Sequence, residues 1–166
     1  MDIKLVQKLI KALEYEEATY GRLLSLSEKK TEYLVKSDTA ALSQLTEEEN
    51  QLIDQTRQLS KVREQLIAML YEGNADMKDA TLENIKNSLP QDQAAAMGRI
   101  QRKLKETVLR LASRNSINQR LIEKAIQYID FNLELITAPR ATTPIYGKSG
   151  EEISGGHKRS MLDIKY

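Results

Sequence analysis

The chain has 166 residues, which is the length of one ordinary domain. Cysteine is absent and histidine occurs once, which excludes a disulfide framework, a thiolate or histidine-rich zinc site and a cysteine nucleophile. The formal net charge is +1 at pH 7, so no global field draws the chain to nucleic acid or membrane. Scarce aromatic residues, glycine and proline favour long helices over a β-sandwich or barrel.

Two long helices are predicted in the first 72 residues. Apolar residues recur every three or four positions over 2–36, in a seam that starts at Ile3 and includes Glu17, and Leu5, Leu9 and Leu23 widen this stripe. The same period returns from Leu42 to Leu70. Ser37 and Asp38 separate the two stretches and supply side chains that cap a second helix. Gly73-Asn74 is a stop signal. We expect an antiparallel hairpin, because each stripe then covers the other; one bent rod is the alternative.

A short helix from Thr81 to Ser88 and a third long helix over 91–137 complete the prediction. Thr81 is a suitable cap, and Pro90 ends the short helix. The expected fold is all-α, an antiparallel bundle of three long helices with coiled-coil-like packing over 1–137. The inward stripe of the third helix comprises Ile100, Leu104, Val108, Leu111, Asn115, Asn118, Ile122, Ala125, Ile129, Leu133 and Ile136.

The composition of the chain changes at Ala138, and most of its glycine and proline residues follow this position. Residues 138–166 are therefore predicted to be a mobile tail. The tail is also amphipathic, which a purely solvating segment does not need. We expect it to dock on a partner, with docking on its own bundle as the alternative. Its apolar residues include Ile153, Met161, Leu162 and Ile164.

No catalytic, cofactor or metal site is predicted, and the chain is not expected to be an enzyme. His157 stands in the glycine-rich tail, where a base cannot be held in a productive geometry. No glycine-rich phosphate loop occurs. No segment resembles a signal peptide, and the longest apolar run, 66–71, is far shorter than a membrane span. We expect a cytoplasmic protein that does not bind nucleic acid and does not insert into a membrane.

The third helix carries two polar features. Its stretch 99–120 holds seven basic residues and one acidic residue, which we interpret as lying against the more acidic first two helices; a surface for an acidic protein partner is the alternative. Asn115 and Asn118 fall on the inward stripe. They are interpreted either as a buried hydrogen-bonded pair that fixes helix register or as a polar gap in a groove filled by another helix.

Three segments resemble the FlgN-type flagellar export chaperones. The first is the pair of N-terminal helical stretches that meet at 36–38 and continue into LSQLTEEE at 42–49. The second is NSINQRLI at 115–122, similar to the family's N-x-x-N-x-x-L-[IL]. The third is IYGKSG at 145–150, similar to Y-G-x-x-G, although Lys148 and Ser149 depart from the family's pattern. The resemblance spans nearly the whole chain.

The resemblance implies a cytosolic type III secretion chaperone that keeps hook–filament junction proteins (FlgK and FlgL type) from aggregating and delivers them to the export gate (FlhA type). It implies that Tyr146 docks on the export gate. The alternative interpretation of Tyr146 is an apolar anchor that holds the tail on the bundle. A coiled-coil adaptor that self-assembles or bridges two proteins is the alternative function, and homo-oligomerisation is left open. The expected client surface comprises Leu111, Asn115, Asn118, Leu121, Ile122, Ile129, Leu133, Ile153, Met161, Leu162 and Ile164.

Overall fold

The computed structural model describes residues 2–71, 81–138, 145–146 and 152–153, and it confirms the all-α bundle. The helices are α1 (Ile3–Lys36), α2 (Thr39–Tyr71), α3 (Leu82–Asn87) and α4 (Gln91–Thr137). Two short strands, β1 (Ile145–Tyr146) and β2 (Glu152–Ile153), pair antiparallel. The chain divides into one unit over 1–122 and a second from Glu123 onward. The predicted boundary between a domain of 1–137 and a tail of 138–166 stays a prediction.

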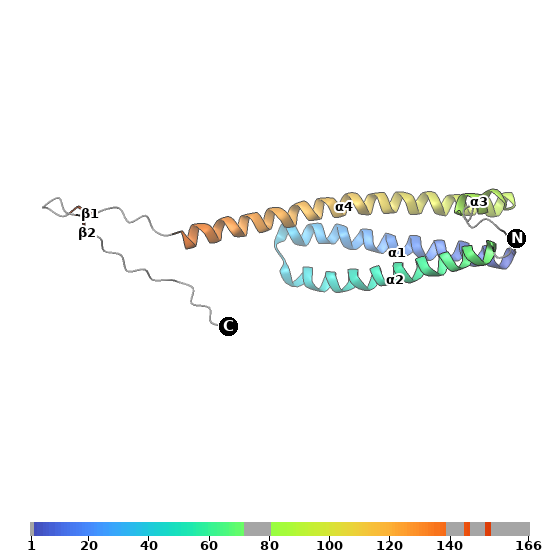
Figure 1. Cartoon of the computed structure of the whole chain (residues 1–166), viewed down its shortest axis with the longest axis horizontal. Helices are drawn as coiled ribbons and strands as arrows, with labels where there is room; N and C mark the ends of the chain where they lie inside the picture. The colour runs from blue at the N-terminus through green and yellow to red at the C-terminus, as the bar shows by residue number, and fades with distance from the viewer. Residues whose placement is uncertain (1, 72–80, 139–144, 147–151, 154–166) are drawn as a thin grey trace. The chain divides into compact units, whose positions relative to one another are not determined.

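The turn between α1 and α2 is a tight C-terminal cap. Ser37 adopts the left-handed conformation with φ 55°, and the N–H of Asp38 donates to the carbonyl of Tyr33 at 3.0 Å. Asp38 Oδ1 then accepts from the N–H of Ala41 at 3.0 Å and caps α2. The chain therefore reverses at 37–38, and α1 and α2 pack as the expected hairpin (Figure 1).

Local capping also sets the start of α3 and α4. Thr81 Oγ1 accepts from the N–H of Asn84 at 3.2 Å, which confirms the predicted cap of the short helix. The carbonyl of Pro90 accepts a hydrogen bond from the N–H of Ala94 at 2.9 Å. Proline is tolerated at the start of a helix, because an N–H group there would have no partner within the helix. The predicted stop at 73–74 lies outside the described residues.

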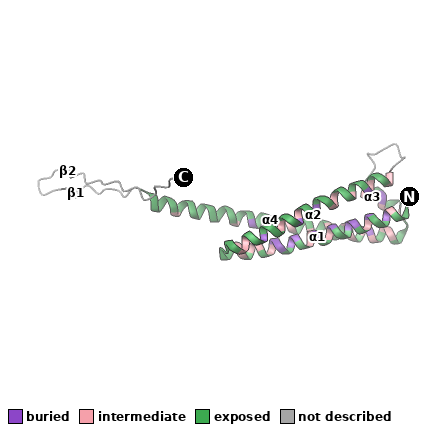
Figure 2. Ribbon diagram, turned by 90° about the horizontal axis from the view of Figure 1, so that it is seen from below, coloured by how far each residue is buried: buried purple, intermediate pink, exposed green. Residues whose placement is uncertain are grey.

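Apolar side chains of the first unit form two clusters along the bundle. The larger cluster joins the N-terminal half of α1 to the C-terminal end of α2, α3 and the start of α4. In the second, Leu23 and Leu26 of α1 meet Leu45 and Leu52 of α2, with Leu111 of α4 packed against them. Figure 2 shows buried residues along the faces of α1 and α2. The buried members of the larger cluster are Leu9, Ala12, Leu13, Leu66, Ile85 and Met97.

One detail of the α1 stripe differs from the prediction. The stripe placed Ile3 and Glu17 inward, but Ile3 is 60% exposed and the buried carboxylate is that of Glu16, which is 2% exposed. A single heptad seam describes contact with one neighbour, whereas α1 packs against α2 and α4 and buries a wider face. Leu9 and Leu23, which were predicted to widen the stripe, are buried.

Candidate functional site

A polar contact layer joins α1 to α4 through the two predicted asparagines. Ser27 Oγ donates to Asn115 Oδ1 at 2.7 Å. Asn118 Nδ2 donates to the carbonyl of Ser27 at 2.8 Å, and Thr31 Oγ1 donates to Asn118 Oδ1 at 2.6 Å. Asn118 is 3% exposed and Ser27 is fully buried. This geometry matches the first interpretation of the pair, in which hydrogen bonds fix the register of two helices.

Charged side chains form a second set of contacts between the helices. The buried carboxylate of Glu16 accepts from Arg63 Nε at 3.1 Å and from Ser60 Oγ at 3.2 Å, both on α2. Between α1 and α4, Nζ of the exposed Lys103 lies 2.9 Å from Oε2 of the half-buried Glu17.

Arg110 Nη2 of the basic stretch also lies 3.6 Å from Glu28 Oε1. Part of the basic stretch of α4 therefore neutralises acidic residues of α1, as the sequence indicated. The Arg110–Glu28 pair is exposed on both sides and contributes little to stability, because water and salt screen it.

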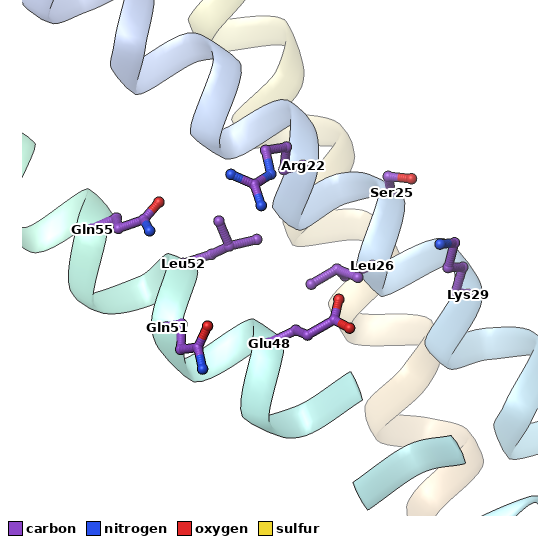
Figure 3. Close-up of a pocket in the computed structure, with 8 residues that line it drawn as sticks. All are labelled: Arg22, Ser25, Leu26, Lys29, Glu48, Gln51, Leu52 and Gln55. Carbon is purple, nitrogen blue, oxygen red and sulfur yellow. The ribbon is translucent and has the colours of Figure 1, made fainter. Parts of the chain in front are cut away.

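A shallow hollow of about 300 Å³ lies between α1 and α2 (Figure 3). Leu26 and Leu52 form its apolar floor, and Arg22, Lys29 and Glu48 stand around it. The floor belongs to the second apolar cluster of the bundle. The lining contains a single carboxylate, so the hollow lacks the paired groups that acid–base catalysis requires.

The described part of the chain also contains no group of three histidine, cysteine, aspartate or glutamate side chains that could hold a metal ion. Over the same residues, no helix has the length and hydropathy needed to cross a membrane. The search for function therefore turns to surfaces that bind another macromolecule.

The predicted client residues on α4 divide into two groups. Leu111 packs in the second apolar cluster, Leu121 is half-buried, and the two asparagines contact α1. Ile122 is 38% exposed, and from there the large apolar side chains of α4 are all exposed (Figure 2).

An aliphatic stripe runs along about the last three turns of α4. We define it as Ile126, Ile129, Leu133 and Ile136, whose spacing of three, four and three places them on one helix face. Each is between 50% and 73% exposed. The predicted client surface included Ile129 and Leu133. The predicted inward stripe also included Ile136, and neither prediction included Ile126.

A second apolar set, Tyr128, Phe131 and Leu135, is 58–69% exposed. Each member follows an aliphatic-stripe residue by two positions, which is about 200° around the helix. The second unit thus presents apolar side chains on two opposite helix faces. Such exposure is typical of an interaction surface, because soluble chains rarely leave contiguous apolar surface in water.

The remaining predicted site residues belong to the tail. Tyr146 lies in β1 and Ile153 in β2, where Ile145 pairs with Ile153 and Tyr146 with Glu152. Three further candidates, Met161, Leu162 and Ile164, lie outside the described residues. The client-binding and gate-docking roles of these residues stay predictions.

Apolar clusters and polar layers hold the helical bundle of the first unit, and the exposed apolar side chains of the second unit are typical of a protein that binds another protein. Residues 1–153 match the family described as FlgN protein. The chain belongs to the FlgN family. No curated protein and no solved structure gives a significant match.

Family membership confirms the resemblance and the class of function. The chain is a flagellar export chaperone of hook-associated proteins of the FlgK and FlgL type. Chaperones of this family are not enzymes, which agrees with the predicted absence of a catalytic constellation. The family match therefore supports the chaperone function and gives no support to the alternative, a coiled-coil adaptor.

Proposed function

We propose that the aliphatic stripe of α4 is the surface that holds the hook-associated client. The observation that carries this proposal is the exposure of four aliphatic side chains at 50–73% in heptad spacing. A helix of the client that lays its own apolar face on this stripe would remove both faces from water. Each fully buried leucine or isoleucine side chain contributes about 1.5–3 kcal/mol before the costs of association are subtracted.

Some residues predicted for the client surface take a different place in this proposal. Asn115 and Asn118 contact α1 and are proposed to position α4 rather than to touch the client. Leu121 is half-buried and Ile122 is 38% exposed, and both precede the stripe in sequence. Leu111 packs in the second apolar cluster and is proposed to hold α4 in the bundle. The tail residues Ile153, Met161, Leu162 and Ile164 are proposed to add contacts when the client binds, because their sequence is apolar and follows α4.

The test is titration calorimetry of the full chain with a purified FlgK-type junction protein. Leu133→Glu should weaken binding at least tenfold, since it puts a charge into an apolar contact. Val35→Glu is the matched control, because Val35 is 69% exposed on α1 and its replacement should leave affinity unchanged. Equal affinities of the wild-type chain and Leu133→Glu would refute the proposed surface.

The second part of the proposal is delivery: in the cytosol, the loaded chaperone docks on a gate component of the FlhA type through Tyr146. The support is the resemblance of the segment 145–150 to the family's tail motif. Tyr146→Ala should leave the calorimetric affinity for the client intact and reduce secretion of the client from cells. Loss of client affinity in this variant would instead show that Tyr146 anchors the tail, and normal secretion would contradict the docking role.

A further inference from the structure

A groove along α3 and the first half of α4 stands apart in sequence from the aliphatic stripe. It has a volume of about 890 Å³ and is confined to residues 82–109 of the first unit. The floor is apolar: Leu82 of α3 and Val108 and Leu109 of α4 line it, and Leu109 is 61% exposed. We call this feature the α3–α4 groove.

Cations border the apolar floor. Arg99, Arg102 and Lys105 recur at intervals of three residues and line the groove. All three are exposed, and within the described part of the chain none of them forms an ion pair. By contrast, Lys86 on α3 is paired with Glu83 of the same helix at 2.5 Å. The α4 side of the groove therefore carries three positive charges that the bundle does not use.

Gly98 lies in the same groove and has no evident role in the packing of the bundle. Glycine is one of the poorest residues in a helix interior. A Cβ at this position would meet only Lys86 Cδ at 3.7 Å, an ordinary van der Waals contact. The bundle would tolerate alanine here, whereas a partner backbone that approaches α4 closely benefits from the missing side chain.

We infer that the α3–α4 groove binds an acidic amphipathic helix of a second protein, separate from the client surface. From Ala94 to Leu109 the groove follows α4 for about 22 Å at 1.5 Å per residue, which matches a helix of roughly 15 residues. The apolar floor takes the apolar face of that helix, and the three unpaired cations take its carboxylates. An apolar floor disfavours nucleic acid, whose outer surface is a phosphate backbone.

The probe is a labelled sixteen-residue peptide with leucines in heptad spacing and glutamates at its polar positions, followed by fluorescence anisotropy with the full chain. The same peptide with lysines in place of glutamates is its control. We expect the acidic peptide to bind, the basic peptide not to bind, and Arg102→Glu to weaken the acidic peptide roughly tenfold at low salt. Lys61→Glu, an identical charge change at an exposed position of α2, should leave binding unchanged.

A second pair of variants separates shape from charge. Gly98→Leu improves helix propensity, and circular dichroism should show the helix content of the wild-type chain. Its side chain enters the groove, so peptide binding should fall at least tenfold. Gly21→Leu is the matched control, because a Cβ at Gly21 of α1 meets no atom within 4 Å. Leu133→Glu on the aliphatic stripe should leave binding of the acidic peptide unchanged, which keeps this inference independent of the proposed client surface.

Four outcomes would overturn the inference. Equal binding of the acidic and basic peptides would remove the role of charge. Binding that Leu133→Glu abolishes and Arg102→Glu leaves intact would assign the peptide to the aliphatic stripe. A dimer in sedimentation that Gly98→Leu dissociates would show that a second copy of the chain fills the groove. Displacement of the peptide by an equimolar single-stranded oligonucleotide would assign the groove to nucleic acid.

Discussion

Replacing Asn118 with alanine tests whether polar contacts hold α4 to α1. The side chain is 3% exposed and makes three hydrogen bonds to α1, two with Ser27 and one with Thr31, at 2.6–3.1 Å. Each such bond contributes about 0.5–1.5 kcal/mol net. Ser27 Oγ keeps Asn115 as a partner, and Thr31 Oγ1 keeps the carbonyl of Ser27 at 3.1 Å, so no hydroxyl is stranded. We expect Asn118→Ala to lower the free energy of unfolding by about 2 kcal/mol.

The assay is urea denaturation of the full chain, followed by circular dichroism at 222 nm. With an m-value of about 2 kcal/mol/M, the midpoint should fall by about 1 M. Asn132→Ala is the control, because Asn132 Nδ2 donates at 2.7 Å to the carbonyl of Tyr128 of its own helix; its midpoint should change by less than about 0.3 M.

A midpoint shift for Asn118→Ala that equals that of Asn132→Ala would refute the reasoning. The hydrogen bonds seen between α1 and α4 would then contribute no net stability, and register would rest on the apolar clusters alone. An unchanged midpoint with a lowered m-value would also contradict the prediction, because it would point to a change in the exposed surface rather than in stability.

Three further substitutions probe other features of the bundle. Arg63→Ala leaves the buried Glu16 carboxylate without its cation and should lower the free energy of unfolding by about 2–4 kcal/mol, measured by urea denaturation; a loss below about 0.5 kcal/mol would contradict it. Ser37→Gly relieves the left-handed backbone at φ 55° and should raise that free energy by about 0.5–1 kcal/mol. Lys103→Ala removes a partner that is 69% exposed and should lower the melting temperature by less than about 2 °C, with a smaller effect at high salt than at low salt.

Helix boundaries were predictable because local chemistry sets them. Ser37 and Asp38 end one helix and cap the next, and Thr81 caps the short helix. Pro90 stands just before α4. Each signal acts through the backbone of its own neighbours, so no knowledge of the tertiary contacts is needed.

The choice between neighbouring positions on a helix was not predictable in the same way. Glu16 and Glu17 are adjacent acidic residues, and the heptad seam of α1 selects Glu17. The structure buries Glu16 because Arg63 and Ser60 of α2 supply its hydrogen bonds. A pairing across 47 positions of sequence depends on how two helices pack, and periodicity along one helix does not contain that information.

The seam of α4 shows a further limit of periodicity. Its heptad spacing continues from Leu111 to Ile136 without a break, yet Leu111 packs in a core cluster and Ile136 is 73% exposed. Spacing identifies a face that can pack against a helix but not whether that helix belongs to the same chain. The sequence pattern placed the client surface on α4, and the exposure of its side chains selects the part that we propose to meet the client.

Stability and binding are expected to reside in different residues of this chaperone. The contacts that resist unfolding, such as Asn118 with Ser27 and Glu16 with Arg63, lie in the first unit. The aliphatic stripe is already exposed to water, so its substitution removes little buried surface from the folded chain. Leu133→Glu should therefore weaken client binding while leaving the urea midpoint within about 0.3 M of the wild-type value. A large fall of the midpoint in that variant would show that the stripe packs within the chain in solution and cannot serve as an open surface for the client.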